Sequence, residues 1–65
     1  MQILVNNEPR DTQVHTLTDL LRELGLEAAV VATAVNGGFV PAGLRPTVEL
    51  QEADRVEVLA PMQGG

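Results

Sequence analysis

The chain contains no cysteine and no lysine, and Phe39 is the single aromatic among its 65 residues. Without thiols the chain can form neither a disulfide nor a thiolate metal site, which fits a reducing compartment. One aromatic side chain cannot provide a stacking platform for nucleic-acid bases. The net charge of −5 also repels phosphate backbones. We therefore expect no nucleic-acid partner and no bound metal.

Long apolar runs and a targeting pattern are absent as well. No apolar stretch approaches the roughly 18 residues that a membrane span requires, and no charged segment followed by an apolar one opens the sequence. We therefore expect a cytoplasmic protein without membrane contacts. A domain of this size buries only about 60% of the surface exposed by its unfolded chain, so a cleft that encloses a substrate is not expected.

The first residues have the pattern of a β-hairpin. Apolar residues alternate over residues 1–5, which predicts a strand with one buried face. Asn6 and Asn7 tolerate left-handed backbone and predict a tight turn. Residues 8–14 are then expected to form a second strand, at an edge of the sheet because Pro9 has no N–H to donate.

An amphipathic helix is predicted next. Thr16 is a suitable N-cap, Asp19 lies near the positive end of the helix dipole, and Gly25 can adopt the left-handed conformation that ends the helix. We interpret the neighbouring His15 and the acidic side chains, including Glu23, as solvated groups. The apolar stripe of this helix consists of Leu17, Leu20, Leu21 and Leu24.

The second half of the chain predicts further strands. Residues 30–35 are small or β-branched and predict a strand that ends at an Asn-Gly-Gly turn. Residues 39–47 contain two prolines and a glycine and are expected to be irregular, apart from a short edge strand over 39–40. A turn over residues 51–54 is expected to lead into a last strand over 55–60.

These elements predict an α+β fold with a mixed sheet of four to five strands and one main helix packed across it, in the order ββαββ. We expect the first and last strands to pair in parallel at the centre of the sheet. Residues 1–60 would then be the folded domain. Because Pro61 cannot donate to the sheet, residues 61–65 are expected to form a flexible tail.

The Gly64-Gly65 pair suggests a chemical role for this tail. Two glycines make a very thin segment that an enclosing enzyme can approach closely. A terminal carboxylate becomes electrophilic when a nucleotidyl group is placed on it. Diglycines also occur as linkers and as disordered ends, so the pair alone does not decide the function.

Several segments resemble the ubiquitin-like β-grasp sulfur carriers, most closely the ThiS-type carriers of thiamin biosynthesis. The resemblance spans the chain in order and without large insertions. The segments that carry it are residues 1–7 (MQILVNN), 34–37 (AVNG), 40–41 (VP), 54–58 (DRVEV) and Gly64-Gly65. One departure is Ala53, which lies in a turn where members of the family often have glycine and where positive φ would strain alanine.

The resemblance implies that the chain is a cosubstrate without catalytic residues of its own. An E1-like, ThiF-type enzyme would adenylate the Gly65 carboxylate with MgATP, and a persulfide from a cysteine desulfurase would displace AMP. The product would be a C-terminal thiocarboxylate, whose sulfur passes to a ThiG-type thiazole synthase. Gly64, Gln63 and Met62 would thread the tail into these enzymes, and no cofactor would stay bound to the carrier.

We expect Leu4 and Leu59 to form the docking surface for partners, because both are placed on the outward face of adjacent strands near the base of the tail. Two alternatives remain open. The chain is a related carrier for molybdopterin or tRNA thiolation or a ubiquitin-like protein modifier, or it is a non-catalytic β-grasp interaction module whose glycines are incidental. The absence of lysine excludes isopeptide chains of the protein on its own ε-amines.

Overall fold

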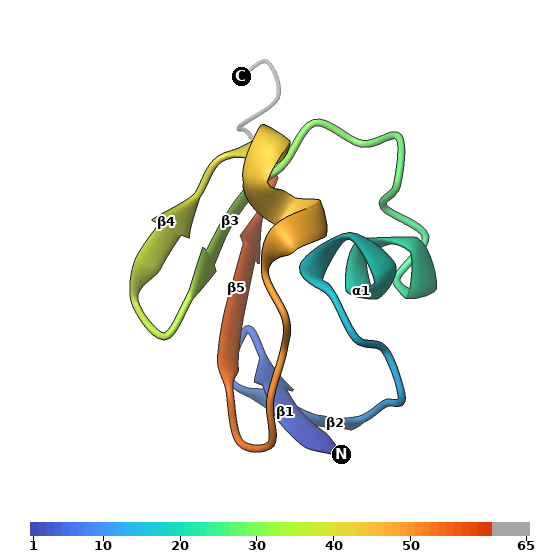
Figure 1. Ribbon diagram of the computed structural model, residues 1–65, viewed down its shortest axis with the longest axis vertical. Coiled ribbons are helices and arrows are strands. Elements are labelled where there is room, and N and C mark those ends of the chain that lie inside the picture. Colours follow the sequence, from blue (N-terminus) through green and yellow to red (C-terminus); the bar gives the residue numbers. More distant parts are fainter. Residues whose placement is uncertain (61–65) are drawn as a thin grey trace.

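The computed structural model describes residues 1–60 and contains a five-stranded mixed sheet with the strand order β2-β1-β5-β3-β4. A helix, α1, and a 3-10 helix, η1, accompany the sheet (Figure 1). The predicted α+β architecture is confirmed. The elements in chain order are β1 (Gln2–Val5), β2 (Glu8–Asp11), α1 (Leu17–Glu23), β3 (Ala32–Val35), β4 (Gly38–Val40), η1 (Ala42–Thr47) and β5 (Arg55–Leu59).

The β1–β2 hairpin has the predicted two-residue turn. Asn6 and Asn7 have φ values of 51° and 68°, the left-handed backbone that the favoured hairpin turns require. The prediction that β2 reaches residue 14 is wrong, because the strand ends at Asp11. Beyond that point the Thr12 hydroxyl accepts a hydrogen bond from the Val14 N–H, and the chain turns toward α1.

Helix α1 is capped at both ends as predicted. The Thr16 hydroxyl accepts a hydrogen bond from the Asp19 N–H at 3.1 Å, and Gly25 has a φ of 77°. Three leucines of the stripe are buried against the sheet, while Leu24 is half-buried at the C-cap. The buried ones are Leu17, Leu20 and Leu21.

Strand β3 is shorter than the predicted 30–35, because it begins at Ala32 and leaves Val30 80% exposed. The Val31 carbonyl accepts a hydrogen bond from the Arg45 Nη2 at 2.6 Å, in place of a hydrogen bond within the sheet. A tight turn at Asn36 and Gly37 then leads into β4 (φ 51° and 84°).

The 3-10 helix η1 is missing from the sequence prediction, which expected irregular chain over residues 39–47. The N–H of Leu44 bonds the Pro41 carbonyl at 2.9 Å, and the Arg45 Nε also donates to the Thr33 hydroxyl at 3.0 Å. No residue of η1 is buried. Polar contacts with β3 hold this helix, so no apolar period marks it in the sequence.

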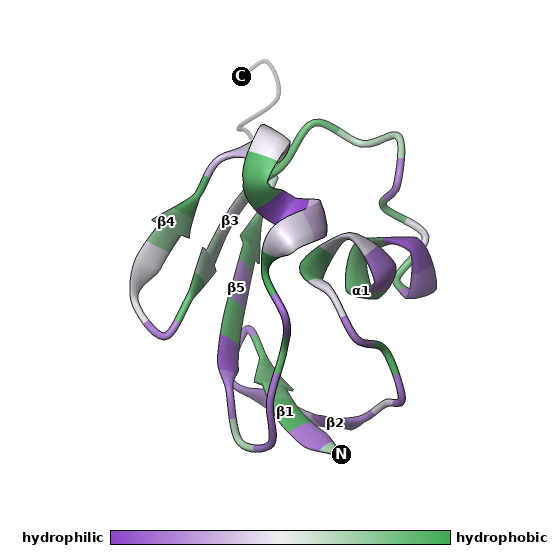
Figure 2. Cartoon of the chain, in the orientation of Figure 1, coloured by the Kyte–Doolittle hydropathy of each residue, from purple (hydrophilic) through white to green (hydrophobic). Residues whose placement is uncertain are grey.

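The first and last strands pair in parallel at the centre of the sheet, as predicted. Leu4 lies opposite Arg55 and Val5 opposite Val56. Apolar residues alternate with polar ones along much of β5, so that one face of the strand is buried against the helices (Figure 2). The core consists of Ile3, Leu17, Leu20, Leu21, Val40, Leu50, Val56 and Val58.

Ala53 lies in the turn before β5 with a φ of 71°, a conformation that costs an L-residue roughly 1–2 kcal/mol. We expect Ala53→Gly to stabilise the protein by about 0.5–1 kcal/mol. Glycine removes the strain in the folded state, and this gain is larger than the free energy lost through the greater conformational entropy of the unfolded chain. Urea unfolding measures the effect. Ala28→Gly, at a position without positive φ, is the control and should give no gain; equal effects of both changes would contradict the strain at Ala53.

Glu23 is not simply solvated charge, which corrects the prediction. Its carboxylate accepts hydrogen bonds from the Arg10 Nε at 2.7 Å and from the Thr12 hydroxyl at 2.8 Å. The bond from Arg10, followed by that from Thr12, lowers the pKa of Glu23 below its ordinary value of 4.5. This cluster joins the end of α1 to β2.

Stability should therefore depend on the ionisation of Glu23. A carboxyl group with a lower pKa in the folded state stabilises the fold above pH 4.5, and this contribution is lost as the pH falls below 4.5 through the folded pKa. We expect Glu23→Gln to lower the free energy of unfolding at neutral pH and to change it much less well below pH 4.5. Urea unfolding at both pH values measures this difference. A loss that is the same at both would exclude the ionised carboxylate as its source.

Candidate functional site

The candidate site is the end of β5, because this strand delivers the chain to the segment predicted to react. Ala60 follows β5 directly and is the last described residue. The tail residues predicted to carry the chemistry lie outside the described residues, and their roles stay predictions: Met62, Gln63, Gly64 and Gly65.

The base of the site is held on both sides. On one side β3 pairs with β5 from Val35↔Val56 to Ala32↔Leu59. On the other side β1 has already ended, and the Asn6 side chain takes its place. The Asn6 Nδ2 donates to the Val58 carbonyl at 3.0 Å, and the Val58 N–H donates to the Asn6 Oδ1 at 2.8 Å.

Asn6 therefore continues the ladder of hydrogen bonds by one step after β1 has turned away. The sequence predicts Asn6 only as a turn residue and does not predict this contact. An asparagine side chain carries a donor and an acceptor in the same arrangement as a peptide group. The Asn-Asn turn at the end of β1 is the only local sequence feature that points to Asn6. Its hydrogen-bond partner, Val58, lies 52 residues away in sequence and has no local pattern that marks it.

The outward face of the sheet has an apolar area beside the end of β5. Leu59 is 60% exposed and lies opposite Ala32, and Phe39 is 71% exposed and lies opposite Ala34. Exposed aromatic and leucine side chains of this kind are candidates for protein contacts. The sequence predicts a docking role for Leu59, whereas Phe39 is predicted only as part of an edge strand.

Leu4 does not lie near the base of the tail, which corrects the predicted geometry. It pairs with Arg55 at the start of β5, whereas Leu59 ends the strand. Four residues of strand separate the two positions, or about 13 Å. Leu4 is half-buried near Pro9 at the hairpin. The two leucines therefore do not form one patch, although a docking role for each stays a prediction.

Within residues 1–60 no group of three or more His, Cys, Asp or Glu side chains is arranged to hold a metal ion. His15 is exposed at the entrance to α1. In the same part of the chain, no helix is long and apolar enough to cross a membrane. The described residues thus provide a hydrogen-bonded base at the end of β5 and an exposed apolar area beside it.

Comparison with known proteins identifies the family. The ThiS family model matches residues 3–65. A sulfur carrier protein ThiS of Thermus thermophilus is 38% identical over 63 residues, which cover 97% of this chain and 98% of that protein. The crystal structure of a thiamine biosynthesis protein (ThiS) from Geobacter metallireducens superposes with a TM-score of 0.85 and 28% identity, with full coverage of both chains. A solution structure of a thiamine biosynthesis protein from the same organism gives a TM-score of 0.80 at 28% identity and covers all of this chain and 88% of that one. The chain therefore belongs to the ThiS family of sulfur carrier proteins.

Proposed function

We propose that the carrier is loaded with sulfur at the carboxylate of Gly65. A ThiF-type adenylating enzyme uses MgATP: a carboxylate oxygen attacks the α-phosphorus, and pyrophosphate leaves. The terminal sulfur of a persulfide, supplied by a cysteine desulfurase, then attacks the acyl carbon and displaces AMP. A thiol cleaves the resulting acyl disulfide and releases the thiocarboxylate, which a ThiG-type synthase uses to form the thiazole of thiamin.

The position of β5 supports this proposal. The strand is central in the sheet, paired by β1 and β3 and held by Asn6, and it leads directly to the residues that precede Gly65. A rigid base fixes the point from which the tail enters another enzyme, which lowers the entropic cost of placing the carboxylate against its reaction partner.

The membership of the family and the printed function of the Thermus relative support a carrier role rather than a catalytic one. In this proposal the partner enzymes supply every catalytic group, and the cofactor MgATP binds the activating enzyme. The proposed location is the cytoplasm, where MgATP and a desulfurase are available. The exposed face with Leu59 and Phe39 is the proposed contact for these enzymes.

The growth requirement of a deletion strain separates thiazole formation from the alternatives. A strain without this gene should grow without thiamin when the thiazole moiety is supplied, and a plasmid copy should remove the requirement. A copy without Gly65 should not. Failure of the thiazole moiety to restore growth would contradict the proposal and favour molybdopterin or tRNA thiolation, or protein modification.

A further inference from the structure

The C-terminal half of β5 is not paired with a strand on the side of β1. Parallel pairing ends at Val5↔Val56. Beyond it, the Asn6 side chain forms hydrogen bonds with both the N–H and the carbonyl of Val58. Backbone groups in a strand point alternately to its two neighbours, so continued extension at Ala60, directly after β5, would point its groups to the same side as those of Val58. Among residues 1–60 no hydrogen bond to the Ala60 N–H is present. Within the described part of the chain, neither the N–H nor the carbonyl of Ala60 has a hydrogen-bond partner.

This edge differs from the outer edge of β2. There Pro9 removes a donor, which disfavours the addition of a strand. The edge at Ala60 has no proline within β5, and Ala60 itself is exposed. An extended segment of another protein can pair here without displacing any described contact.

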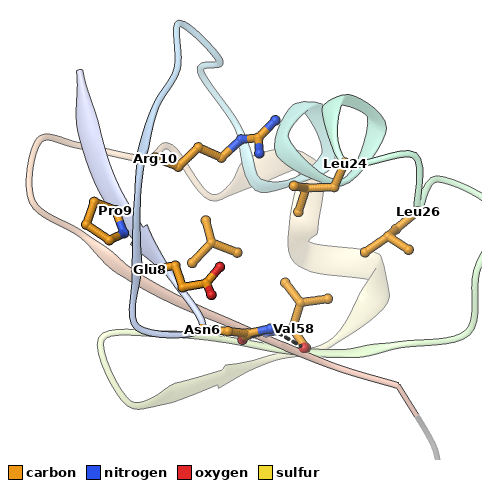
Figure 3. Close-up of a pocket in the computed structure, with 8 residues that line it drawn as sticks. Asn6, Glu8, Pro9, Arg10, Leu24, Leu26 and Val58 are labelled. Carbon is orange, nitrogen blue, oxygen red and sulfur yellow. Dashed lines mark hydrogen bonds between the residues drawn. The ribbon is translucent and has the colours of Figure 1, made fainter.

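A hollow of about 290 Å³ lies next to this edge, on the face of the sheet that carries α1. Figure 3 shows Glu8 and Arg10 on one side of the hollow and Leu24 and Leu26 on the other, with Asn6 bonded to Val58. The apolar residues that line it are Val5, Leu24, Leu26 and Val58. A strand that pairs with Ala60 would point every second side chain to this face of the sheet.

The rim of the hollow favours a basic side chain. Arg10 is bound to Glu23 at 2.7 Å, so its charge is already compensated. Glu8 is exposed and forms no ion pair with any residue in the described part of the chain. The net charge of −5 adds to the attraction for a cationic segment.

We propose that the end of β5 is a strand-addition site for the adenylating enzyme. An extended segment of that enzyme pairs with the backbone of Ala60 and places an apolar side chain in the hollow. A neighbouring arginine or lysine of the segment pairs with Glu8. This inference rests on the proposed function, because the partner is the enzyme that activates Gly65. The pairing fixes the direction in which the tail leaves the domain.

Charge reversal at the rim provides the first test. Glu8→Arg should raise the Kd for the adenylating enzyme about tenfold or more, because like charges then face each other. Glu49→Arg is the matched control, since Glu49 is also exposed and does not line the hollow. It should change the Kd by less than about twofold. Equal effects of the two variants would overturn the proposal, and melting temperatures check that both are folded.

Methyl NMR of the unaltered carrier provides an independent test. Addition of the adenylating enzyme without ATP should shift the methyl signals of Val5, Leu24 and Leu26 and protect the Ala60 amide from hydrogen exchange. Shifts confined to Leu59 and other outward residues would overturn this inference but leave the proposed function intact. The same shifts caused by removal of residues 61–65, or by raising the concentration of the carrier alone, would overturn it too. They would assign the hollow to the tail or to a second copy.

Discussion

Deletion of Gly65 is expected to abolish sulfur loading while the fold stays intact. The new terminal carboxylate of Gly64 would fall short of its position by one residue, or about 3.5 Å. A misplacement of only about 1 Å can already cost roughly 10²-fold in rate. We therefore expect thiocarboxylate formation to drop by at least about 10²-fold in an assay with the adenylating enzyme, MgATP and a sulfur donor.

The control for this deletion is Gln63→Ala, which keeps the length of the tail. It should load at a rate within roughly tenfold of the unaltered protein, because the reacting carboxylate keeps its reach. The melting temperature of both proteins should be unchanged, since residues 61–65 follow the described domain. Normal loading of the protein without Gly65 would contradict the assignment of the reacting carboxylate.

Leu20→Ala is expected to cause the largest loss of stability. Leu20 is fully buried between α1 and the sheet, and truncation of such a leucine typically costs 2–5 kcal/mol through lost burial and the cavity left behind. A domain of this size has a total stability of only about 3–10 kcal/mol. We therefore expect the variant to be largely destabilised or unfolded in urea titrations followed by circular dichroism.

Leu44→Ala is the matched control, because Leu44 lies in η1 and is 53% exposed. Its effect on the free energy of unfolding should stay within about 0.5 kcal/mol. A loss at Leu44 as large as that at Leu20 would show that η1, and not the helix–sheet core, dominates the stability.

The parts of the fold that could be predicted are those with a strong local or periodic signal. The leucine stripe, the Thr16 cap and Gly25 together define α1, and each agrees with the others. Alternation over residues 55–59 similarly defines β5. The parallel pairing of β1 with β5 was expected from the order of the elements and is present.

The parts that could not be predicted depend on contacts between distant segments. Arg45 donates hydrogen bonds to the Thr33 hydroxyl of β3 and to the Val31 carbonyl, and these contacts hold η1 against β3. Neither contact is marked by a local sequence pattern. The register of β1 on β5 likewise separates Leu4 from Leu59, although both lie on the outward face. A shift along a strand changes which side chains are neighbours without changing the alternation.

The candidate site was predictable in its chemistry and less so in its surroundings. Gly64 and Gly65 can be identified from the sequence because their lack of side chains suits a threaded tail. The support from Asn6 and the position of Phe39 beside the end of β5 required the structure, because both depend on contacts of distant segments with β5.

The most direct test of the central claim is the intact mass of the carrier after incubation with the adenylating enzyme, MgATP, a cysteine desulfurase, cysteine and a thiol. We predict the mass increase of one exchange of oxygen for sulfur, located by fragmentation at Gly65 and absent when ATP is left out. An unchanged mass with active enzymes, or a sulfur atom at any other residue, would contradict the account.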